Sequence, residues 1–442
     1  MAVGGVTAGM RPRRARVSGV VARLTAANVL NAAGGFVTGP LLARALGASG
    51  RGDLQAVIVP LSLVPGVLGL GIPAFAYRTL PRGRRVEEVI GSLGLPLLAI
   101  GLVAAAAAVP VADFLAAGRA TVRTWLIVGL LTTPLVLLVS LMLSSLAALE
   151  RWRAVVVMTA IPFAVPFVAT IVLFVSGHLT VATAAAAAIA ASVLAIVPAV
   201  PLLIRVRRPV FRLSLARGGL DFGLKSWLGG LAVTANARLD QVLMITFVSS
   251  RQLGLYAVAT TISGVFGLVT GAVSPPLMTR IASGERHLIP QAVRIVVMLT
   301  VGMNVIVALM TPIVLSALFG PEFEGAAEMA FVLLAASIPL AGASVLSSAL
   351  QADGAPLIPT AAEAIALVIT VTGLLTLLRP LEGMGAALVS LAAYSASFMV
   401  QVIVAKRRLG VPFRAFVIPS GDDVRWGWGL VGSAAHRLRT SM

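Results

Sequence analysis

Apolar runs of about 20 residues, separated by charged or turn-forming residues, follow one another along almost the whole chain. A helix of that length rises about 1.5 Å per residue and matches the ~30 Å hydrocarbon core of a bilayer. The pattern therefore predicts an all-α polytopic membrane protein with twelve spans. The predicted limits are 22–45, 54–77, 89–111, 124–149, 154–176, 181–204, 224–248, 254–280, 291–318, 327–350, 357–378 and 384–405.

The seventh span breaks the apolar pattern, because Asn236, Arg238, Asp240 and Gln241 lie in its middle. A charged side chain at that depth costs at least ~2.5–3.5 kcal/mol on insertion scales, so such residues usually face a bundle interior or a wet cavity. In an unbroken helix, Asn236 and Asp240 share a face and Arg238 lies roughly opposite. Two interpretations stay open: Arg238 binds an anionic substrate and Asp240 couples an ion, or both make structural links between helices.

Composition supports the membrane assignment, since 59% of the 442 residues are hydrophobic, 11% are charged and the mean hydropathy is +1.01. With no cysteine and three scattered histidines, we expect neither disulfides nor a metal site, and no cofactor. The net charge of +18 suggests a nucleic-acid partner, but the basic residues lie in short runs between spans. We therefore expect no nucleic acid as a partner.

The distribution of basic residues predicts the orientation. With the N-terminus inside, 27 lysines and arginines lie in inside segments and 6 in outside segments, and Arg238 is the remaining one. The positive-inside rule then places both termini in the cytoplasm. The loops are too short for a catalytic domain, so we expect a protein that is not an enzyme.

The two halves of the chain resemble each other when one is shifted by 202 positions. The identities are Gly52 with Gly254, Pro73 with Pro275, and Arg78 with Arg280. Each half has six spans, so the repeat is parallel, with its axis along the membrane normal. The predicted domains are an N-terminal lobe (1–204), a basic cytoplasmic linker (205–223), a C-terminal lobe (224–408) and a basic cytoplasmic tail (409–442). The linker is either an amphipathic helix on the inner leaflet or an ordinary loop, and the tail is either an interfacial anchor or disordered.

Four segments carry a resemblance to a known family: LARALGASGRGDL at 42–54, ARLDQVLM at 237–244, SSRQLGLYAVAT at 249–260 and LFGPEFEGAA at 318–327. They resemble the polysaccharide (lipid-linked oligosaccharide) flippases, whose superfamily includes the multidrug and toxin extruders and the peptidoglycan lipid-precursor flippase. The resemblance implies two six-helix lobes in a V around a central cavity. It also implies export of an undecaprenyl-pyrophosphate-linked oligosaccharide across the plasma membrane by alternating access, with a polysaccharide polymerase and glycosyltransferases as partners.

Within that resemblance, Arg238 and Asp240 match the Arg-x-Asp of the seventh span in the family. The other expected cations for the pyrophosphate are Arg23, Arg44 and Arg78, and the polar groups expected to contact sugar are Asn31, Asn236 and Gln241. No GxxxxGK[ST] motif is present, so an ion gradient, coupled through Asp240, is the expected source of free energy. The chain departs from the peptidoglycan-precursor flippase in having twelve predicted spans instead of fourteen, and its first lobe is poor in charge at mid-depth.

Two other functions remain open at this point. A drug or cation antiporter of the same fold would need cavity carboxylates, and Asp240 is the only acid that the sequence places clearly at mid-membrane. A non-transporting membrane scaffold for envelope polysaccharide assembly would need no ligand at all.

Overall fold

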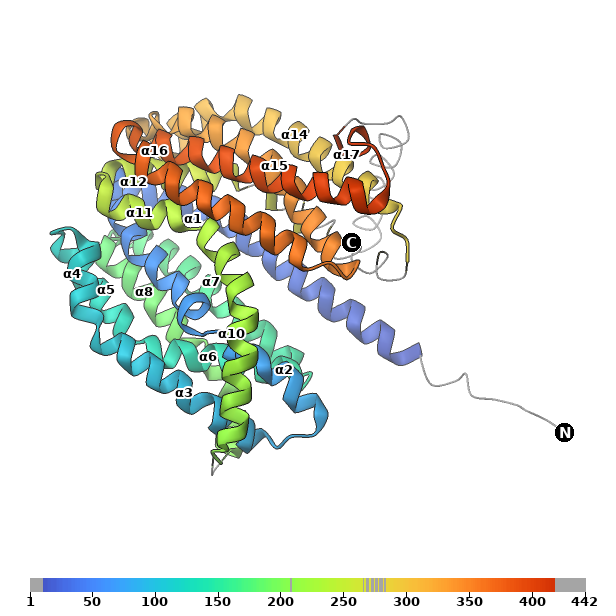
Figure 1. Ribbon diagram of the computed structural model, residues 1–442. Coiled ribbons are helices and arrows are strands. Elements are labelled where there is room, and N and C mark those ends of the chain that lie inside the picture. Colours follow the sequence, from blue (N-terminus) through green and yellow to red (C-terminus); the bar gives the residue numbers. More distant parts are fainter. Residues whose placement is uncertain are drawn as a thin grey trace. The chain divides into compact units, whose positions relative to one another are not determined.

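Figure 1 shows the computed structural model of the protein, in which every regular element of the described residues is a helix. It describes residues 11–206, 209–264, 266–267, 270–271, 274, 277, 281 and 284–417. The side chains of residues 11–33, 228, 229 and 233 lie outside that description, as do residues 418–442 of the predicted tail.

Seven helices of the described part are long and apolar enough to cross a membrane, or eight if the bent pair α5 (Ala120–Leu131) and α6 (Thr133–Ala148) forms one span. Some of these helices contain two predicted spans. α1 (Arg11–Leu68) takes in 22–45 and most of 54–77, and α16 (Leu357–Leu409) takes in 357–378 and 384–405. The chain is therefore a multi-pass helical membrane protein, and the count of twelve spans stays a prediction.

Each of these two long helices is interrupted at one residue. Gly47 in α1 has φ 67° and ψ 179°, and Glu382 in α16 has φ 46° and ψ −126°. Positive φ is easily adopted by glycine but disfavoured for a residue with a Cβ. These residues lie in the predicted turns between the first and second spans and between the eleventh and twelfth, so each turn is made almost without a loop.

The second predicted span, 54–77, ends earlier as regular helix than the hydropathy suggests. α1 stops at Leu68, and a 3-10 turn at Ile72–Phe75, the short α2 (Ala76–Thr79) and a second 3-10 turn at Leu80–Arg82 follow. The reason lies in the backbone, because Leu70 and Gly71 have φ of 47° and 66°. Hydropathy alone cannot predict where the backbone changes from an α-helix to 3-10 turns within an apolar run.

The chain divides into two compact units. The first consists of Met1–Thr38, Leu61–Asp113 and Arg123–Leu228. Besides α2, α5 and α6, its helices are α3 (Val86–Ala106), most of α4 (Ala108–Ala116), α7 (Trp152–Val175), α8 (Val181–Leu194), α9 (Val200–Arg205) and the first part of α10 (Leu213–Asn236). Its core forms where α3 packs on α6, with the side chains of Leu93, Leu97, Leu137, Leu141 and Leu146 fully buried.

The second unit consists of Gly39–Pro60, Phe114–Val122 and Gly229–Met442. Its helices include α11 (Leu239–Phe247), α12 (Ser250–Ser263), α14 (Leu288–Val314), α15 (Ala326–Ala352), α16 and α17 (Arg414–Val417). In the most apolar 18-residue stretch of α15, 61% is buried inside the protein, against 28% in the corresponding stretches of α14 and α16. α15 is therefore the central helix of this unit and packs against α12, α14 and α16, with the last two beside it in Figure 1.

The two compact units are groups of contacting segments and do not test the predicted domains. The division into lobes at 1–204 and 224–408 therefore stays a prediction. α10 begins at Leu213, inside the predicted linker 205–223, and residues 207–208 of that linker are outside the described part. The start of the predicted tail 409–442 forms α17, and the side chain of Phe416 is fully buried in the core of the second unit.

The glycines related by the 202-residue shift meet each other inside the second unit. A Cβ on Gly52 would lie 1.8 Å from the carbonyl oxygen of Ser250, and a Cβ on Gly254 would lie 1.9 Å from that of Ala48. Ala48 and Ser250 are themselves 202 positions apart, so the contact is reciprocal. Such a contact is expected where a symmetry axis of the repeat passes between two helices.

Candidate functional site

The polar seventh span is a broken helix. α10 ends at Asn236 and α11 begins at Leu239, while Arg238 between them has φ −144° and ψ −10°. The prediction that Arg238 lies opposite to Asn236 and Asp240 rested on an unbroken helix and is wrong, because the backbone is not helical at Arg238. A break of this kind frees backbone groups inside a membrane, which is tolerated where protein or a cavity satisfies them.

Asn236 is buried and is bonded to α16. Its Nδ2 donates to the Glu363 backbone oxygen at 2.9 Å and to Glu363 Oε2 at 2.8 Å, and Thr370 Oγ1 lies 3.4 Å from its Oδ1. Ser397 Oγ donates to the other carboxylate oxygen of Glu363 at 3.0 Å. The carboxylate of Glu363, a half-buried residue, is thus held by an amide and a hydroxyl, and no lysine or arginine of the described residues pairs with it.

Asp240 is buried at the other side of the break. Its Oδ2 accepts the hydroxyl of Tyr256 from α12, and its Oδ1 accepts the backbone N–H of Gln241 at 2.7 Å. The Tyr256 hydroxyl also lies 3.5 Å from Ser390 Oγ on α16. These partners hold the acid inside the second unit and leave it without an ion-pair partner among the described residues.

Gln241 and Arg238 have fewer partners. Gln241 is 4% exposed, and its Oε1 has no hydrogen-bond partner in the described part of the chain. Arg238 is exposed and forms no ion pair with any described residue. The break therefore presents a cation without an ion-pair partner, in a unit that also holds the carboxylates of Asp240 and Glu363.

Among the remaining predicted arginines, Arg44 lies in the same unit as this break and is bonded to another part of that unit. In the second unit, Arg44 Nε donates to the Leu318 carbonyl oxygen at 2.8 Å and its Nη2 donates to that of Ala317, at the end of the π-helical turn Leu315–Phe319. A cation at a helix C-terminus stabilises the unpaired carbonyl groups there. Arg78 belongs to the first unit, as do Arg23 and Asn31, whose side chains lie outside the described ones.

Arg78 lines a cavity of about 500 Å³ in the first unit, together with Arg82 and Arg84. Its guanidinium carbon lies 5.7 Å from the ring centroid of Phe222. Arg78 was expected as a cation at the end of the second predicted span, whereas Arg82 and Arg84 were not predicted as functional residues.

Two charged residues were not predicted as functional from the sequence. The first is Glu363. It is the only charged residue between 357 and 378, so its isolation in an apolar run could have identified it as a candidate. The second is Arg119, which entered only the charge count. Nothing local marks it, because all of its partners outside its own turn are distant in sequence.

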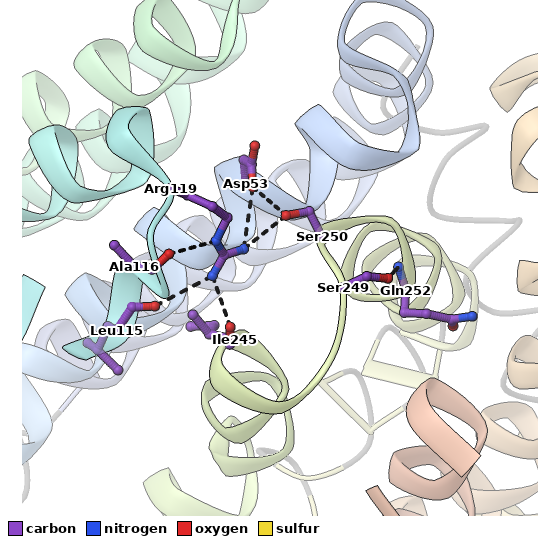
Figure 2. Close-up of polar contacts among 8 residues, drawn as sticks. All are labelled: Asp53, Leu115, Ala116, Arg119, Ile245, Ser249, Ser250 and Gln252. Atoms are coloured by element: carbon purple, nitrogen blue, oxygen red, sulfur yellow. Dashed lines mark hydrogen bonds and ion pairs between the residues drawn. The ribbon is translucent and has the colours of Figure 1, made fainter. Parts of the chain in front are cut away.

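Figure 2 shows the contacts of Arg119, which joins three segments of the second unit. Its Nη1 lies 3.0 Å from Ser250 Oγ and 3.4 Å from Asp53 Oδ1, and its Nη2 donates to the Ile245 carbonyl oxygen at 2.9 Å. Its Nε donates to the carbonyl oxygen of Ala116 at 2.9 Å, and Ser250 Oγ donates to Asp53 Oδ1 at 2.6 Å. One guanidinium thus uses three nitrogens to join α1, the turn before α5, the end of α11 and the start of α12.

Known proteins that are similar to this chain agree with the helical membrane fold described above. A family model described as polysaccharide biosynthesis protein matches residues 20–282, which is more than half of the chain. No curated protein sequence matches the chain significantly.

Solved structures with the same fold are transporters and flippases. The lipid II flippase MurJ in an inward closed conformation superposes with a TM-score of 0.73 at 13% identity, covering 89% of each chain. An inward-facing multidrug resistance MATE family transporter of the MOP superfamily gives 0.70 at 15% identity, covering 88% of this chain and 98% of the other. The MATE multidrug transporter DinF-BH superposes with a TM-score of 0.62 at 13% sequence identity, covering 93% of this chain and 98% of the other. At these identities the similarity establishes the fold.

Proposed function

Because the chain belongs to the polysaccharide biosynthesis protein family, we propose that it is a flippase that moves a lipid-linked oligosaccharide from the inner to the outer leaflet of the plasma membrane. The observation that carries the proposal is the helix break at Arg238, in the polar middle of the seventh predicted span. An exposed guanidinium with no carboxylate partner among the described residues suits a diphosphate, which accepts bidentate hydrogen bonds from arginine.

Sugar hydroxyls need hydrogen-bonding groups close to that cation. Gln241 has a buried amide oxygen with no partner among the described residues, and Asn236 lies at the end of α10 next to the break. In this proposal Arg238 binds the diphosphate, Gln241 contacts sugar, and Asn236 contacts sugar once it gives up its bonds to Glu363, while the polyprenyl chain stays in the bilayer.

The driving force would come from an ion gradient through two carboxylates. Asp240 and Glu363 are bonded to neutral groups, so each can take up a proton or a small cation without breaking an ion pair. A change in the charge of an acid within a helix bundle alters the stability of its surroundings and so can bias one conformation over another.

The test is surface polysaccharide in the native host after replacement of the chromosomal copy. We expect Arg238→Ala and Asp240→Asn to abolish or strongly reduce it at normal protein level. The matched control is Arg153→Ala, which removes an exposed arginine from a predicted cytoplasmic loop and should leave the amount unchanged. Wild-type levels in both site variants would refute the assignment of the site.

The polymerase and glycosyltransferase partners belong to the same proposal. A flippase for a lipid-linked repeat requires enzymes that build the repeat and enzymes that consume it. We expect their genes beside this one, and a neighbourhood without any would count against the proposed substrate.

The two carboxylates also favour a second function, which is export of a lipophilic cation. Neither Asp240 nor Glu363 has a lysine or arginine nitrogen within 4.0 Å among the described residues, and acids of this kind within a membrane protein can bind a cationic ligand. Efflux of ethidium from cells that overproduce the protein, lost in Glu363→Gln, would support this function over the flippase. Unaltered surface polysaccharide in the same variant would strengthen that conclusion.

A further inference from the structure

The cavity beside Arg78 in the first unit concentrates positive charge. Arg78, Arg82 and Arg84 come from α2 and the short connection between α2 and α3, and Lys225 comes from α10. The cavity volume of about 500 Å³ falls within the range of ordinary small-molecule sites. All four of these side chains are exposed, so water and salt screen their repulsion, and their positive charge attracts an anion wherever acids do not offset it.

Acids of the described chain do not offset it. The one carboxylate that lines the cavity, Asp221, is paired with Lys225, whose Nζ lies 2.8 Å from it. None of the three arginines has a carboxylate within 4.0 Å among the described residues. The three arginine charges of the lining therefore remain available to an anion.

Close backbone packing holds the two walls of the cavity together. A Cβ on Gly71 would lie 2.4 Å from the Gly223 carbonyl oxygen, and a Cβ on Gly223 would lie 2.5 Å from that of Leu70. The stacking of Arg78 on Phe222 further limits the positions of one guanidinium. Preorganised arginines lose less conformational entropy on binding an anion than free ones do.

The cavity also has an apolar side, which narrows the choice of anion. Phe75, Leu215 and Phe222 line it together with the arginines, and the hydroxyls of Thr79 and Ser214 add polar contacts. Phe75 and Phe222 themselves pack with ring centroids 5.6 Å apart. A ligand that joins a phosphate to an apolar chain matches both sides, whereas a free metabolite would leave the aromatic side exposed to water.

We propose that this cavity binds the phosphate group of a lipid, with Arg78, Arg82 and Arg84 donating to the phosphate oxygens. Arginine is suited to this role because its planar fork matches two oxygens of one phosphate. The source of the phosphate is either a glycerophospholipid headgroup or a polyprenyl diphosphate. The proposal concerns binding alone, so failure of the proposed transport would leave it standing.

The experiment uses the full-length protein in phosphatidylcholine nanodiscs that contain a few per cent of phosphatidylglycerol or of farnesyl diphosphate, and native mass spectrometry counts the lipids retained. The variant is Arg82→Ala with Arg84→Ala. The matched control is Arg85→Ala with Arg217→Ala, which removes the same charge from exposed residues of the same connection and of α10 that do not line the cavity. The conservative variant Arg82→Lys with Arg84→Lys keeps the charge and removes the fork.

We expect retention of one phosphate lipid by the wild type, a loss of affinity of at least about tenfold in the alanine variant, and wild-type retention in the control. Preference for farnesyl diphosphate would identify a polyprenyl diphosphate site, and preference for phosphatidylglycerol a phospholipid site. An equal loss in variant and control would mean attraction to charge alone and would overturn the proposal, as would absence of phosphate-dependent retention. Thermal melting of each variant confirms that the protein remains folded.

Discussion

At the scale of single residues, the helix crossing at Gly52 and Gly254 has no space for a methyl group. A Cβ at either position would lie less than 2.0 Å from a backbone oxygen of the other segment, and backbone atoms cannot move aside as a side chain can. The crossing brings the residues just before the second predicted span against the start of α12 within the second unit. Any side chain at either glycine must therefore separate the two segments.

We expect Gly52→Ala and Gly254→Ala each to destabilise the folded protein by about 1–3 kcal/mol or more, the usual cost of overpacking a tight contact. The measurement is the thermal melting of the purified protein in one detergent. Gly302→Ala in α14 is the control, because a Cβ there meets no atom within 4 Å. If all three variants melt together, the crossing is not a constraint on stability.

Sequence reasoning at this scale identified the residue types that stand out from an apolar background. Arg238 and Asp240 stand out in this way, and the structure gives each a distinct environment, exposed and buried. Glu363 stands out equally, but it was passed over because it lies near the end of a predicted span. The partners of these residues could not be predicted, because Asn236 and Glu363 are 127 positions apart and no local pattern links them.

At the scale of elements, hydropathy predicted the apolar segments and placed turns where Gly47 and Glu382 interrupt the two long helices, but it did not predict the interruption at Arg238. Arg238 lies inside the seventh predicted span, where the apolar pattern gives no sign of a helix end. In a membrane helix nearly every position is apolar, so the 3.6-residue period that reveals the buried face of a soluble helix is weak. The break at Arg238 also removed the basis for assigning faces to Asn236, Arg238 and Asp240.

The Arg119 cluster joins elements that the sequence analysis treated as separate loops. We expect Arg119→Ala to lower the free energy of unfolding by about 1–3 kcal/mol, because it leaves Asp53 and the Ile245 carbonyl group without this donor. Arg119→Lys should recover only part of the loss, since an ammonium group cannot reach several acceptors in the geometry of a guanidinium. Chemical or thermal unfolding of the purified protein measures both.

Arg123→Ala serves as the control for this cluster. Arg123 pairs with Asp113, and both side chains are about half exposed, so the pair contributes ~0–1 kcal/mol. An Arg119 variant as stable as the Arg123 variant would contradict the role assigned to the cluster.

At the scale of the whole molecule, the two compact units do not follow the chain in simple halves. Residues 39–60 and 114–122 from the first half belong to the unit that contains 229–442. The apolar pattern shows where spans lie along the chain but not which spans share a core. That grouping depends on contacts between residues far apart in sequence, of which the Gly52–Gly254 crossing is an example.

The predicted orientation is accessible to a simple labelling test, because the chain has no cysteine of its own. His178→Cys lies in an exposed turn after α7, which the charge distribution places outside, and Arg85→Cys lies in an exposed connection placed inside. In intact cells we expect a membrane-impermeant maleimide to label His178→Cys and to label Arg85→Cys only after permeabilisation. The reverse result would invert the topology.

The central claim is that this protein moves a lipid-linked oligosaccharide across a bilayer. It is tested most directly with the purified protein in vesicles that contain the radiolabelled lipid-linked oligosaccharide extracted from the host. A membrane-impermeant glycosidase added outside reports the fraction of substrate in the outer leaflet after an ion gradient is imposed. Wild-type vesicles should expose substrate beyond the initially accessible fraction, and Arg238→Ala vesicles should not. Equal exposure in wild-type, Arg238→Ala and protein-free vesicles would contradict the account.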